Sequence, residues 1–208
     1  MSDPSPAQAM WDERYRAKDY VYGTEPNGFL RCHLDQIPAG DVLCLADGEG
    51  RNSVFLAERG WRVTAIDLSE VGVAKARALA RERGVEVNFI VHDLRIFDLG
   101  IENYDAVTSI FAHMPPKIRT DLHARVVAAL RPRGVFLLEA YRPEQISRGT
   151  GGPSLPEMMM TLEELRRDLS SLDLVWTSEL ERDIREGLGH QGVGSVVQVI
   201  GCKRGGAE

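Results

Sequence analysis

The sequence predicts a doubly wound α/β domain, in which helices cover both faces of a mostly parallel sheet. Strand-like and helix-like segments alternate through the first two thirds of the chain. A glycine turn, Gly48-Glu49-Gly50, follows the first apolar strand, where such sheets meet nucleotide-like ligands. Towards the end, two strand-like runs have no helix between them, so we expect them to pair as an antiparallel hairpin.

Two helices are expected before the sheet begins. A short amphipathic pattern covers residues 10–17, and Pro26 with Asn27 suits the start of a second helix over residues 27–36. An aromatic loop joins the two. The first strand is expected over residues 41–45, because a turn signal precedes an apolar run there.

The next elements are marked by glycines and a serine at helix ends. Gly60 ends the helix that follows the glycine turn, and a strand over residues 61–66 then leads into Asp67. Ser69 is a good N-cap for a long helix that Gly84 closes. The pattern predicts helices over 50–59, 69–83 and 115–130, and strands over 86–91, 103–110 and 134–141.

The C-terminal third changes character. The Gly- and Pro-rich residues 142–160 are too many for a simple connection, and we expect them to form a lid-like loop. Thr161 and Glu164 have the spacing of a capping box, which starts a helix that ends at about residue 169 or 170. Strand-like runs over residues 172–182 and 195–203 complete the hairpin.

Length and composition favour one domain over residues 1–208. With 208 residues and 43% hydrophobic content, the chain can bury one full core. Within it we expect N-terminal helices and a lid over residues 1–37, the lid-like loop, and the terminal hairpin over residues 172–203.

Charge and cysteine usage narrow the class of partner. The net charge of −6 argues against an extended nucleic-acid footprint, and no apolar run has the length of a membrane span. The N-terminus lacks the pattern of a secretion signal. Cys32, Cys44 and Cys202 are scattered without CxxC spacing, which predicts reduced thiols and no metal. We therefore expect a cytoplasmic protein, a monomer or homodimer, that does not bind nucleic acid or membranes.

Three short segments carry a resemblance to a known family: Trp11-Asp12-Glu13-Arg14-Tyr15, Gly48-Glu49-Gly50-Arg51-Asn52-Ser53 and Ile110-Phe111-Ala112-His113-Met114-Pro115. With the acid after strand two and the final hairpin, the chain resembles the class I S-adenosylmethionine-dependent methyltransferases. Within them it looks most like the tellurite-resistance and thiopurine group of small-molecule enzymes. The resemblance implies a seven-stranded sheet of order 3-2-1-4-5-7-6 with the last strand antiparallel. It also implies S-adenosylmethionine as cofactor, S-adenosylhomocysteine as product, and a small acceptor such as a thiol, a thiopurine or a chalcogen oxyanion.

The resemblance also implies where the cofactor binds. Gly48 and Gly50 match the glycines that let the backbone approach the methionine part, and Asn52 belongs to the same turn. Asp67 matches the acid that binds the ribose hydroxyls, with Leu68 over the adenine. An ordinary strand-to-helix turn, and a helix-capping role for Asp67, are the alternatives.

Further cofactor positions follow strands three and four. Asp93 and Leu94 match the residues that contact the adenine, although an Asp at a strand end is also common in loops. Phe111 lies where the family places the sulfonium. Tyr22 is expected either to pack on the cofactor or substrate, or to anchor the N-terminal helix.

The chain departs from the family pattern beside the glycine turn. Many members carry an acid near the end of strand one and a glycine before the turn, whereas this chain has Cys44 and Ala46. Its acid is instead Asp47, which we expect to bind the amino group of the methionine part directly or through water.

Three residues are predicted to act at the reaction centre: His113, Arg185 and His190. Methyl transfer from a sulfonium needs alignment more than acid–base help. His113 is expected either to remove a substrate proton or to satisfy a backbone carbonyl. Arg182 and Arg185 match cationic C-terminal positions of tellurite-type enzymes and are expected to hold an anionic substrate, with solvated surface charge as the alternative. His190 lies in a glycine-flanked loop that can reach the site.

Two other functions fit the same fold class. A dinucleotide-dependent oxidoreductase would want a third glycine where Ser53 stands, and more chain for its second substrate. A protein that binds S-adenosylmethionine or its product without catalysis is the third possibility, and a turnover assay separates it from an enzyme.

Overall fold

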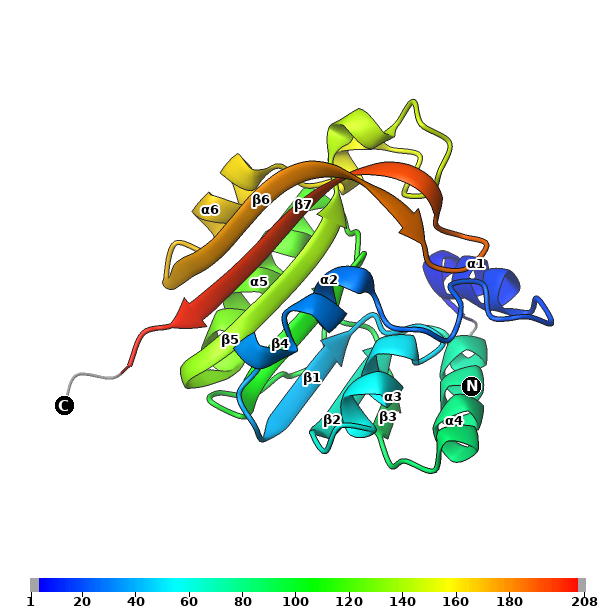
Figure 1. Cartoon of the computed structure of the whole chain (residues 1–208), viewed down its shortest axis with the longest axis horizontal. Coiled ribbons are helices and arrows are strands. Elements are labelled where there is room, and N and C mark those ends of the chain that lie inside the picture. Colours follow the sequence, from blue (N-terminus) through cyan, green and yellow to red (C-terminus); the bar gives the residue numbers. More distant parts are fainter. Residues whose placement is uncertain (1–3, 206–208) are drawn as a thin grey trace.

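Seven strands form one sheet in the order β3-β2-β1-β4-β5-β7-β6, in a computed structural model that describes residues 4–205 (Figure 1). The strands are β1 (Asp41–Leu45), β2 (Arg62–Asp67), β3 (Asn88–Val91), β4 (Tyr104–Ile110), β5 (Leu130–Tyr141), β6 (Leu172–Arg185) and β7 (Gln191–Lys203). β1 to β5 pair in parallel, and β7 pairs antiparallel with both β5 and β6. The predicted strand order and antiparallel last strand are confirmed.

Helices cover both faces of this sheet, as predicted. They are α1 (Pro6–Tyr15), α2 (Gly28–Cys32), α3 (Arg51–Ala57), α4 (Glu70–Arg83), α5 (Pro116–Ala129) and α6 (Leu162–Asp168). In Figure 1, α2 and α3 lie in front of the strands, whereas α5 and α6 lie behind them. Short 3₁₀ turns occur at Leu34–Gln36, Pro143–Gln145 and Pro156–Met158.

Residues 42–45 of β1 form a continuous apolar run because both faces of this strand are buried. Along β1, Val42 and Cys44 pack in the cluster that contains Phe29 of α2 and Phe55 of α3. Leu43 and Leu45 point the other way, into the cluster that contains Leu122 and Val126 of α5 and Leu165 of α6. Successive side chains of a strand alternate between faces, so one apolar run serves two cores.

Capping signals correctly predicted both ends of α4 and the start of α6, whereas α3 ends at Ala57 with Glu58 as its C-cap, before the predicted end at Gly60. Ser69 Oγ accepts the backbone N–H of Gly72, and Gly84 ends α4 in the left-handed conformation. Both halves of the capping box between Thr161 and Glu164 are formed at the start of α6.

The N-terminal helices differ from their predicted bounds. Helix α1 starts at Pro6 rather than residue 10, because Ser5 caps it by accepting the N–H of Gln8 and proline suits the first turn. Helix α2 stops at Cys32 instead of residue 36, and a 3₁₀ turn replaces its last part.

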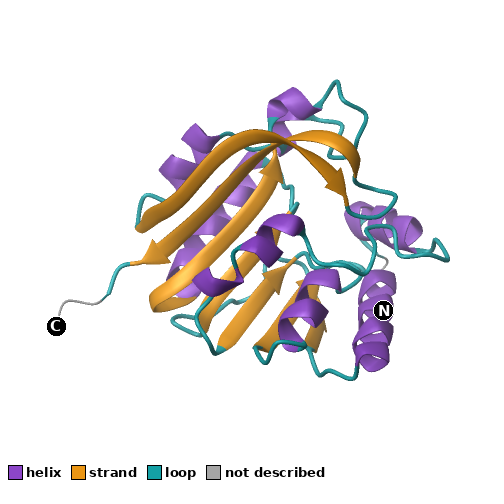
Figure 2. Cartoon of the chain, viewed as in Figure 1, coloured by secondary structure: helices purple, strands orange, loops and turns teal. Residues whose placement is uncertain are grey.

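The terminal hairpin is longer than predicted. β6 extends to Arg185 and β7 begins at Gln191, so only residues 186–190 form the turn (Figure 2). Gly192 and Gly194 were interpreted as loop residues, but they pair with Ile184 and Arg182 in the ladder. Neighbouring side chains explain both glycines: a Cβ would lie 2.8 Å from Cγ2 of Thr150 at the first, and 2.7 Å from Cδ1 of Ile184 at the second.

The long segment between β5 and α6 is mostly loop, with two 3₁₀ turns that the sequence did not predict (Figure 2). Its end is anchored rather than free. Met159 and Met160 are each 1% exposed, and the Met159 carbonyl accepts a hydrogen bond from Arg119 of α5 at 3.0 Å. Packing is therefore the role of these two methionines.

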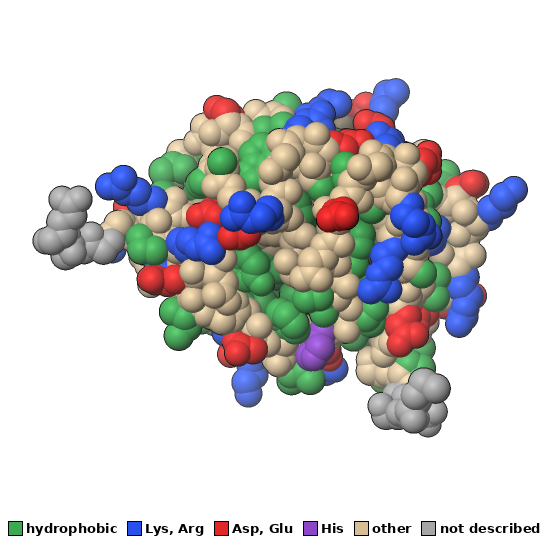
Figure 3. Space-filling view, turned by 90° about the horizontal axis from the view of Figure 1, so that it is seen from below, with side chains coloured by type: hydrophobic (Ala, Val, Ile, Leu, Met, Phe, Trp, Pro, Cys, Tyr) green, Lys and Arg blue, Asp and Glu red, His purple; other side chains and the backbone are tan. Residues whose placement is uncertain are grey.

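The outer surface mixes charges of both signs. On the face in Figure 3, Lys and Arg side chains are interspersed with Asp and Glu around hydrophobic residues. Within residues 4–205, no helix is both long and apolar enough to cross a membrane.

Candidate functional site

A cleft of about 840 Å³ opens at the carboxyl ends of the parallel strands. This is the edge at which open α/β sheets bind ligands. Helix α1, the glycine turn, the start of α5, the loop at residues 151–158 and the β6–β7 turn surround it. Most predicted site residues line this cleft: Tyr22, Asp47, Gly48, Asn52, Asp67, Leu68, Asp93, Leu94, Phe111, His113 and His190. Gly50 and Arg185 do not line it.

The acid at the end of β2 and the glycine turn after β1 are joined. Asp67 Oδ2 accepts the N–H of Gly48, and its Oδ1 accepts the N–H of Ser69, both at 2.8 Å. Asp67 therefore also supports the start of α4, as the capping alternative predicted. A carboxylate has about four acceptor positions, so two of them are left for a ligand.

Each glycine of the turn makes room for a different neighbour. Gly48 has φ of 59°, and a Cβ there would lie 2.5 Å from the hydroxyl of Tyr15 in α1. At Gly50, with φ of 90°, a Cβ would lie 2.7 Å from the Cβ of Ala76 in α4. We predicted that both glycines admit the cofactor. For Gly50 this is wrong, because its missing side chain admits helix α4.

Two carboxyl groups in the cleft have raised pKa values. Burial raises the pKa of Asp47 to about 7, against the lowering effect of its hydrogen bond from Ser53, and the nearby Asp67 raises it further. Burial also raises the pKa of Asp67 to about 6, opposed by the backbone N–H groups that it accepts. Two such acids favour a ligand with a positive charge or hydroxyl donors.

Two non-glycine residues with positive φ end the central strands. Ala46 follows β1 with φ of 48°, and Phe111 follows β4 with φ of 54°. Such conformations are uncommon outside glycine and cluster at functional sites. Phe111 is held by its N–H bond to the Glu139 carbonyl at 2.8 Å and by stacking on Tyr141 at 4.6 Å between ring centroids.

His113 is committed to the backbone. Its Nε2 accepts the N–H of Tyr141 at 2.9 Å, and burial lowers its pKa to about 4. Of the two roles predicted for it, the structural one is therefore closer: the ring accepts the Tyr141 N–H, and a backbone hydrogen bond with Phe111 opposes the lowering of its pKa by burial.

Asp93 and Tyr22 lie in the cleft and are also engaged with protein groups. Arg95 binds the Asp93 carboxylate through Nε at 2.7 Å, and this hydrogen bond lowers the pKa of Asp93. Tyr22 accepts a hydrogen bond from Arg14 of α1 at 3.0 Å and packs beside His190, so it anchors the N-terminal segment as well as lining the cleft.

A buried ion network fixes the β6–β7 turn to the sheet. Glu139 of β5 is fully buried and accepts hydrogen bonds from Arg182, Asn27 and Gln198. Glu186 of the turn pairs with Arg182 at 2.8 Å and with Arg51 of the glycine turn at 2.7 Å. Burial opposes ionisation of Glu186, but the charges of Arg51 and Arg182 lower its pKa to about 2.

The two arginines that we predicted to hold the substrate form ion pairs with acids of the protein instead. Arg182 neutralises the buried acids of this network. Arg185 has 86% of its side chain exposed and pairs with Asp183 at 2.8 Å. Its predicted catalytic role is not supported, because it lies outside the cleft as solvated surface charge.

Sequence reasoning missed several residues that line the cleft: Trp11, Arg14, Tyr15, Arg51, Met114, Ile118, Leu155 and Met158. Trp11 and Tyr15 are four residues apart and share one face of α1, which stacks their rings 5.6 Å apart. The four-residue spacing could have identified this pair as cleft residues from the sequence. For Arg51 the sequence gave no signal beyond its place directly after the glycine turn, because its partner Glu186 is remote in sequence.

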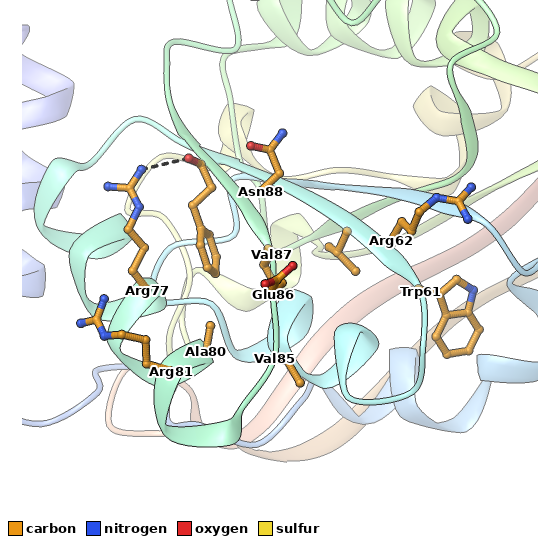
Figure 4. Close-up of a pocket in the computed structure, with 11 residues that line it drawn as sticks. Trp61, Arg62, Arg77, Ala80, Arg81, Val85, Glu86, Val87 and Asn88 are labelled. Atoms are coloured by element: carbon orange, nitrogen blue, oxygen red, sulfur yellow. Dashed lines mark hydrogen bonds between the residues drawn. The ribbon is translucent and has the colours of Figure 1, made fainter.

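A second hollow, of about 670 Å³, lies at the opposite ends of the strands, beside edge strand β3 (Figure 4). Trp61, Arg62 and Asn88 stand at the amino ends of β2 and β3, and Arg77 donates to the Phe89 carbonyl at 3.0 Å. This hydrogen bond gives a partner to one backbone carbonyl of the short, exposed edge strand. Neither hollow contains a cluster of metal ligands within the described residues 4–205.

Comparison with known proteins finds similarity to methyltransferases. A family model described as "Methyltransferase domain" matches residues 42–134. A 2-heptyl-1-hydroxyquinolin-4(1H)-one methyltransferase of Mycobacteroides abscessus is 27% identical over 125 residues, 57% of this chain and 55% of that protein. A ubiquinone biosynthesis O-methyltransferase of Idiomarina loihiensis is 32% identical over 111 residues, 51% of this chain and 44% of its own length. The chain thus spans about half the length of these curated relatives.

Solved structures show the same fold. A protein studied for conversion of a disulfide bond into a thioacetal group during echinomycin biosynthesis superposes with a TM-score of 0.78 at 19% identity, covering 97% of this chain and 93% of that one. TehB from Haemophilus influenzae superposes with a TM-score of 0.70 at 16% identity, covering 95% of this chain and 67% of its own.

Proposed function

We propose that this chain is a class I S-adenosylmethionine-dependent methyltransferase, and that it transfers a methyl group from S-adenosylmethionine to a small-molecule nucleophile. The observation that carries this proposal is the fixed pair of Asp67 and Gly48 inside the cleft. The carboxylate keeps two acceptor positions for ribose hydroxyls, while the turn leaves the backbone open beside it.

The rest of the lining suits the same cofactor. Leu68 and Leu94 offer apolar cover for an adenine ring beside Asp67. Asp47 lies at the other side of the glycine turn, where a carboxylate is complementary to the amino group of the methionine part. The NAD-dependent alternative has no comparable support, since the family model that matches describes a methyltransferase domain.

The bound cofactor supplies a methyl group that its sulfonium has already activated. The chain's own residues align the acceptor with this methyl group and enclose both in the cleft. Trp11 and Tyr15 of α1, with Tyr22, close one side of the cleft, and the Phe111 ring lies between Tyr141 and His190 at the end of β4. An acceptor held among these rings is kept from water and in line with the methyl group.

The acceptor we propose is a small molecule, with thiols, thiopurines and chalcogen oxyanions as first candidates. The cleft volume falls within the roughly 300–1,000 Å³ that small-molecule sites occupy. The fold shared with TehB is the support for a tellurite-type acceptor. The names of the curated relatives span a hydroxyquinolone, a ubiquinone precursor pathway, glycine or sarcosine, and tRNA, so they do not choose the nucleophile.

Two measurements test the function. Calorimetry with S-adenosylmethionine and S-adenosylhomocysteine should show binding that Asp67→Ala weakens, and no binding of either compound would refute the proposal. Release of S-adenosylhomocysteine should then be assayed with thiols, thiopurines, chalcogen oxyanions, small acids and amines. Binding without turnover on any acceptor would favour a non-catalytic sensor, and turnover only on RNA or protein would refute the small-molecule acceptor.

A further inference from the structure

His190 is enclosed in the cleft wall with nothing to bond. The residue is 6% exposed, and its ring lies 4.4 Å from that of Phe111, 4.6 Å from Tyr22 and 5.4 Å from Tyr141. Its Nδ1 is buried without a hydrogen-bond partner among residues 4–205. Nε2 is not enclosed in this way, so it is the nitrogen that remains available to the cleft.

Arg51 presents a second unpaired group on the same wall. Nη2 of its guanidinium pairs with Glu186 at 2.7 Å, and 7% of the side chain is exposed. Nη1 is buried and has no partner in the described part of the chain. Buried polar atoms are nearly always satisfied in native proteins, so two unpaired ones make this part of the wall unusual. Both atoms are themselves enclosed, so a ligand in the cleft would meet His190 at Nε2 and Arg51 through its charge.

The His190 ring is neutral, and the burial of its Nδ1 decides which ring nitrogen carries the proton. Burial, and then the positive charge of Arg51, lower the pKa of His190 to about 3, so the ring is neutral at ordinary pH. An unpaired N–H is rarer in buried sites than an unpaired acceptor, which places the proton on Nε2 rather than on the enclosed Nδ1. The groups whose charges act on this ring are Arg51, Arg182, Glu186 and His113.

The other acids and imidazoles that line the cleft are already engaged. Asp47 binds Ser53, Glu49 pairs with Lys75, Asp67 binds backbone N–H groups, Asp93 binds Arg95, His92 contacts the Asp93 carbonyl, and His113 binds the Tyr141 N–H. Beside His190, the described lining therefore offers an acceptor molecule an N–H donor and the positive charge of Arg51, and no uncommitted base.

The walls beyond these groups are apolar. Met114 and Ile118 come from the loop before α5 and its first turn, and Leu155 and Met158 come from the loop between β5 and α6. Leu155 is 52% exposed, so this side of the cleft presents hydrophobic surface at its mouth. An acceptor that fits has an apolar or aromatic body and one polar end.

We propose that the methyl acceptor is an apolar or aromatic molecule whose hydroxyl or thiol is already ionised, and that the Nε2–H of His190 and the charge of Arg51 hold this anion. The inference rests on the proposed methyltransferase function and names its substrate class. In the transfer step the oxygen or sulfur anion forms a bond to the methyl carbon, the bond from that carbon to the sulfonium breaks, and its electron pair stays on sulfur. The products are a neutral methyl ether or thioether and S-adenosylhomocysteine, and no proton moves.

The test is a series of phenols and thiophenols of graded acidity, assayed for S-adenosylhomocysteine release across pH 5.5 to 10. We expect kcat/KM to rise with pH and to level off at the pKa of each acceptor, while amines of similar size stay inactive. A break that is common to all acceptors and lies away from pH 6 to 7, where Asp67 and Asp47 titrate, would reveal a protein base and overturn the proposal, as would faster turnover of the amines.

Substitutions at His190 supply the second arm. His190→Phe should raise KM for the ionised acceptors at least about tenfold, the loss expected for a hydrogen bond to a charged group. His190→Gln, which keeps an N–H donor, should recover most of that loss. His33→Phe, at the end of α2 and outside the cleft, is the matched control. Equal KM values in His190→Phe and the parent, with S-adenosylhomocysteine still bound, would overturn the anion site while leaving the methyltransferase function standing.

Discussion

The carboxylate of Asp67 and the backbone N–H of Gly48 meet at 2.8 Å, so the acid that ends β2 holds the turn that ends β1. Any ligand that binds one of them is positioned relative to the other. This coupling makes the cofactor site a rigid unit at the edge of the sheet, and the first prediction follows from it.

Asp67→Asn should weaken S-adenosylhomocysteine binding by about ten- to a hundredfold, because hydrogen bonds from ribose hydroxyls to a charged carboxylate are lost. Isothermal titration calorimetry measures the change. Asp173→Asn is the control, since it neutralises an exposed acid of β6 that pairs with Arg204. An Asp67→Asn affinity equal to that of the parent would contradict the ribose assignment.

The raised pKa of Asp47 predicts a pH dependence of stability. The group titrates at about 7 in the folded protein and at about 3.9 when unfolded, so the folded state binds more protons between these values. Its contribution to stability is therefore complete below about pH 4 and is lost as the pH rises through 7. Asp47→Asn cannot ionise and should gain on the parent, by a few kcal/mol, as the pH rises from about 4 to about 7.

Urea unfolding at several pH values checks this prediction. Asp98→Asn provides the comparison, because Asp98 is an exposed loop acid that also accepts a backbone N–H, from Gly100. A constant difference between Asp47→Asn and the parent at all pH values would show that Asp47 is ionised throughout.

Gly50→Ala should be destabilising for two separable reasons. The positive φ of 90° strains any side chain, and the new Cβ would meet Ala76 at 2.7 Å. We expect a loss of about 2–4 kcal/mol in the free energy of unfolding. Gly60→Ala isolates the backbone cost, because at φ of 93° its Cβ would meet nothing within 4 Å. Its loss should be about 1 kcal/mol.

The steric part of the Gly50→Ala effect is tested by a double-mutant cycle with Ala76→Gly. Removing the Ala76 side chain should recover part of the loss even though glycine is unfavourable within helix α4. Strict additivity of the two substitutions would mean that the contact with α4 is not the reason for the glycine.

Arg182 and Arg185 lie three residues apart on β6, and we expect opposite outcomes from their replacement. Arg182→Met leaves Glu139 and Glu186 without their shared cation and should cost about 3–5 kcal/mol of stability. Arg185→Met removes an exposed pair with Asp183 and should leave the unfolding midpoint and the KM for every acceptor unchanged. A rise in KM for Arg185→Met alone would restore the substrate role that the structure does not support.

Local signals predicted the fold well wherever they were complete. Strand β1 was predicted to the residue, because an apolar run is bounded by a turn on each side. Gly192 and Gly194 were wrongly predicted to lie in a loop. They lie in β7, and the close side chains of Thr150 and Ile184, rather than a turn, require glycine there. The spacing of residues in the sequence does not show such close contacts, because Thr150 and Ile184 belong to other segments of the chain than the glycines they contact.

The same limit applied to the site. Asp67 and Gly48 were predictable from their places at strand ends. The partner of Arg51 was not, because Glu186 lies on the hairpin turn and reaches the glycine turn only after the whole sheet has formed. Tyr15 against Gly48 is a similar case, since the position of α1 depends on its packing against α4.

The position of β7 has a consequence for how the protein is made. Among the seven described strands β7 is synthesised after the other six, yet it lies between β5 and β6 and is the only neighbour that joins β6 to the rest of the sheet in the described structure. Until residues 191–203 emerge, β5 has one bare edge and β6 has no partner. The sheet therefore stays incomplete until residues 191–203 have been synthesised, and the β6–β7 turn can close the cleft only after that point.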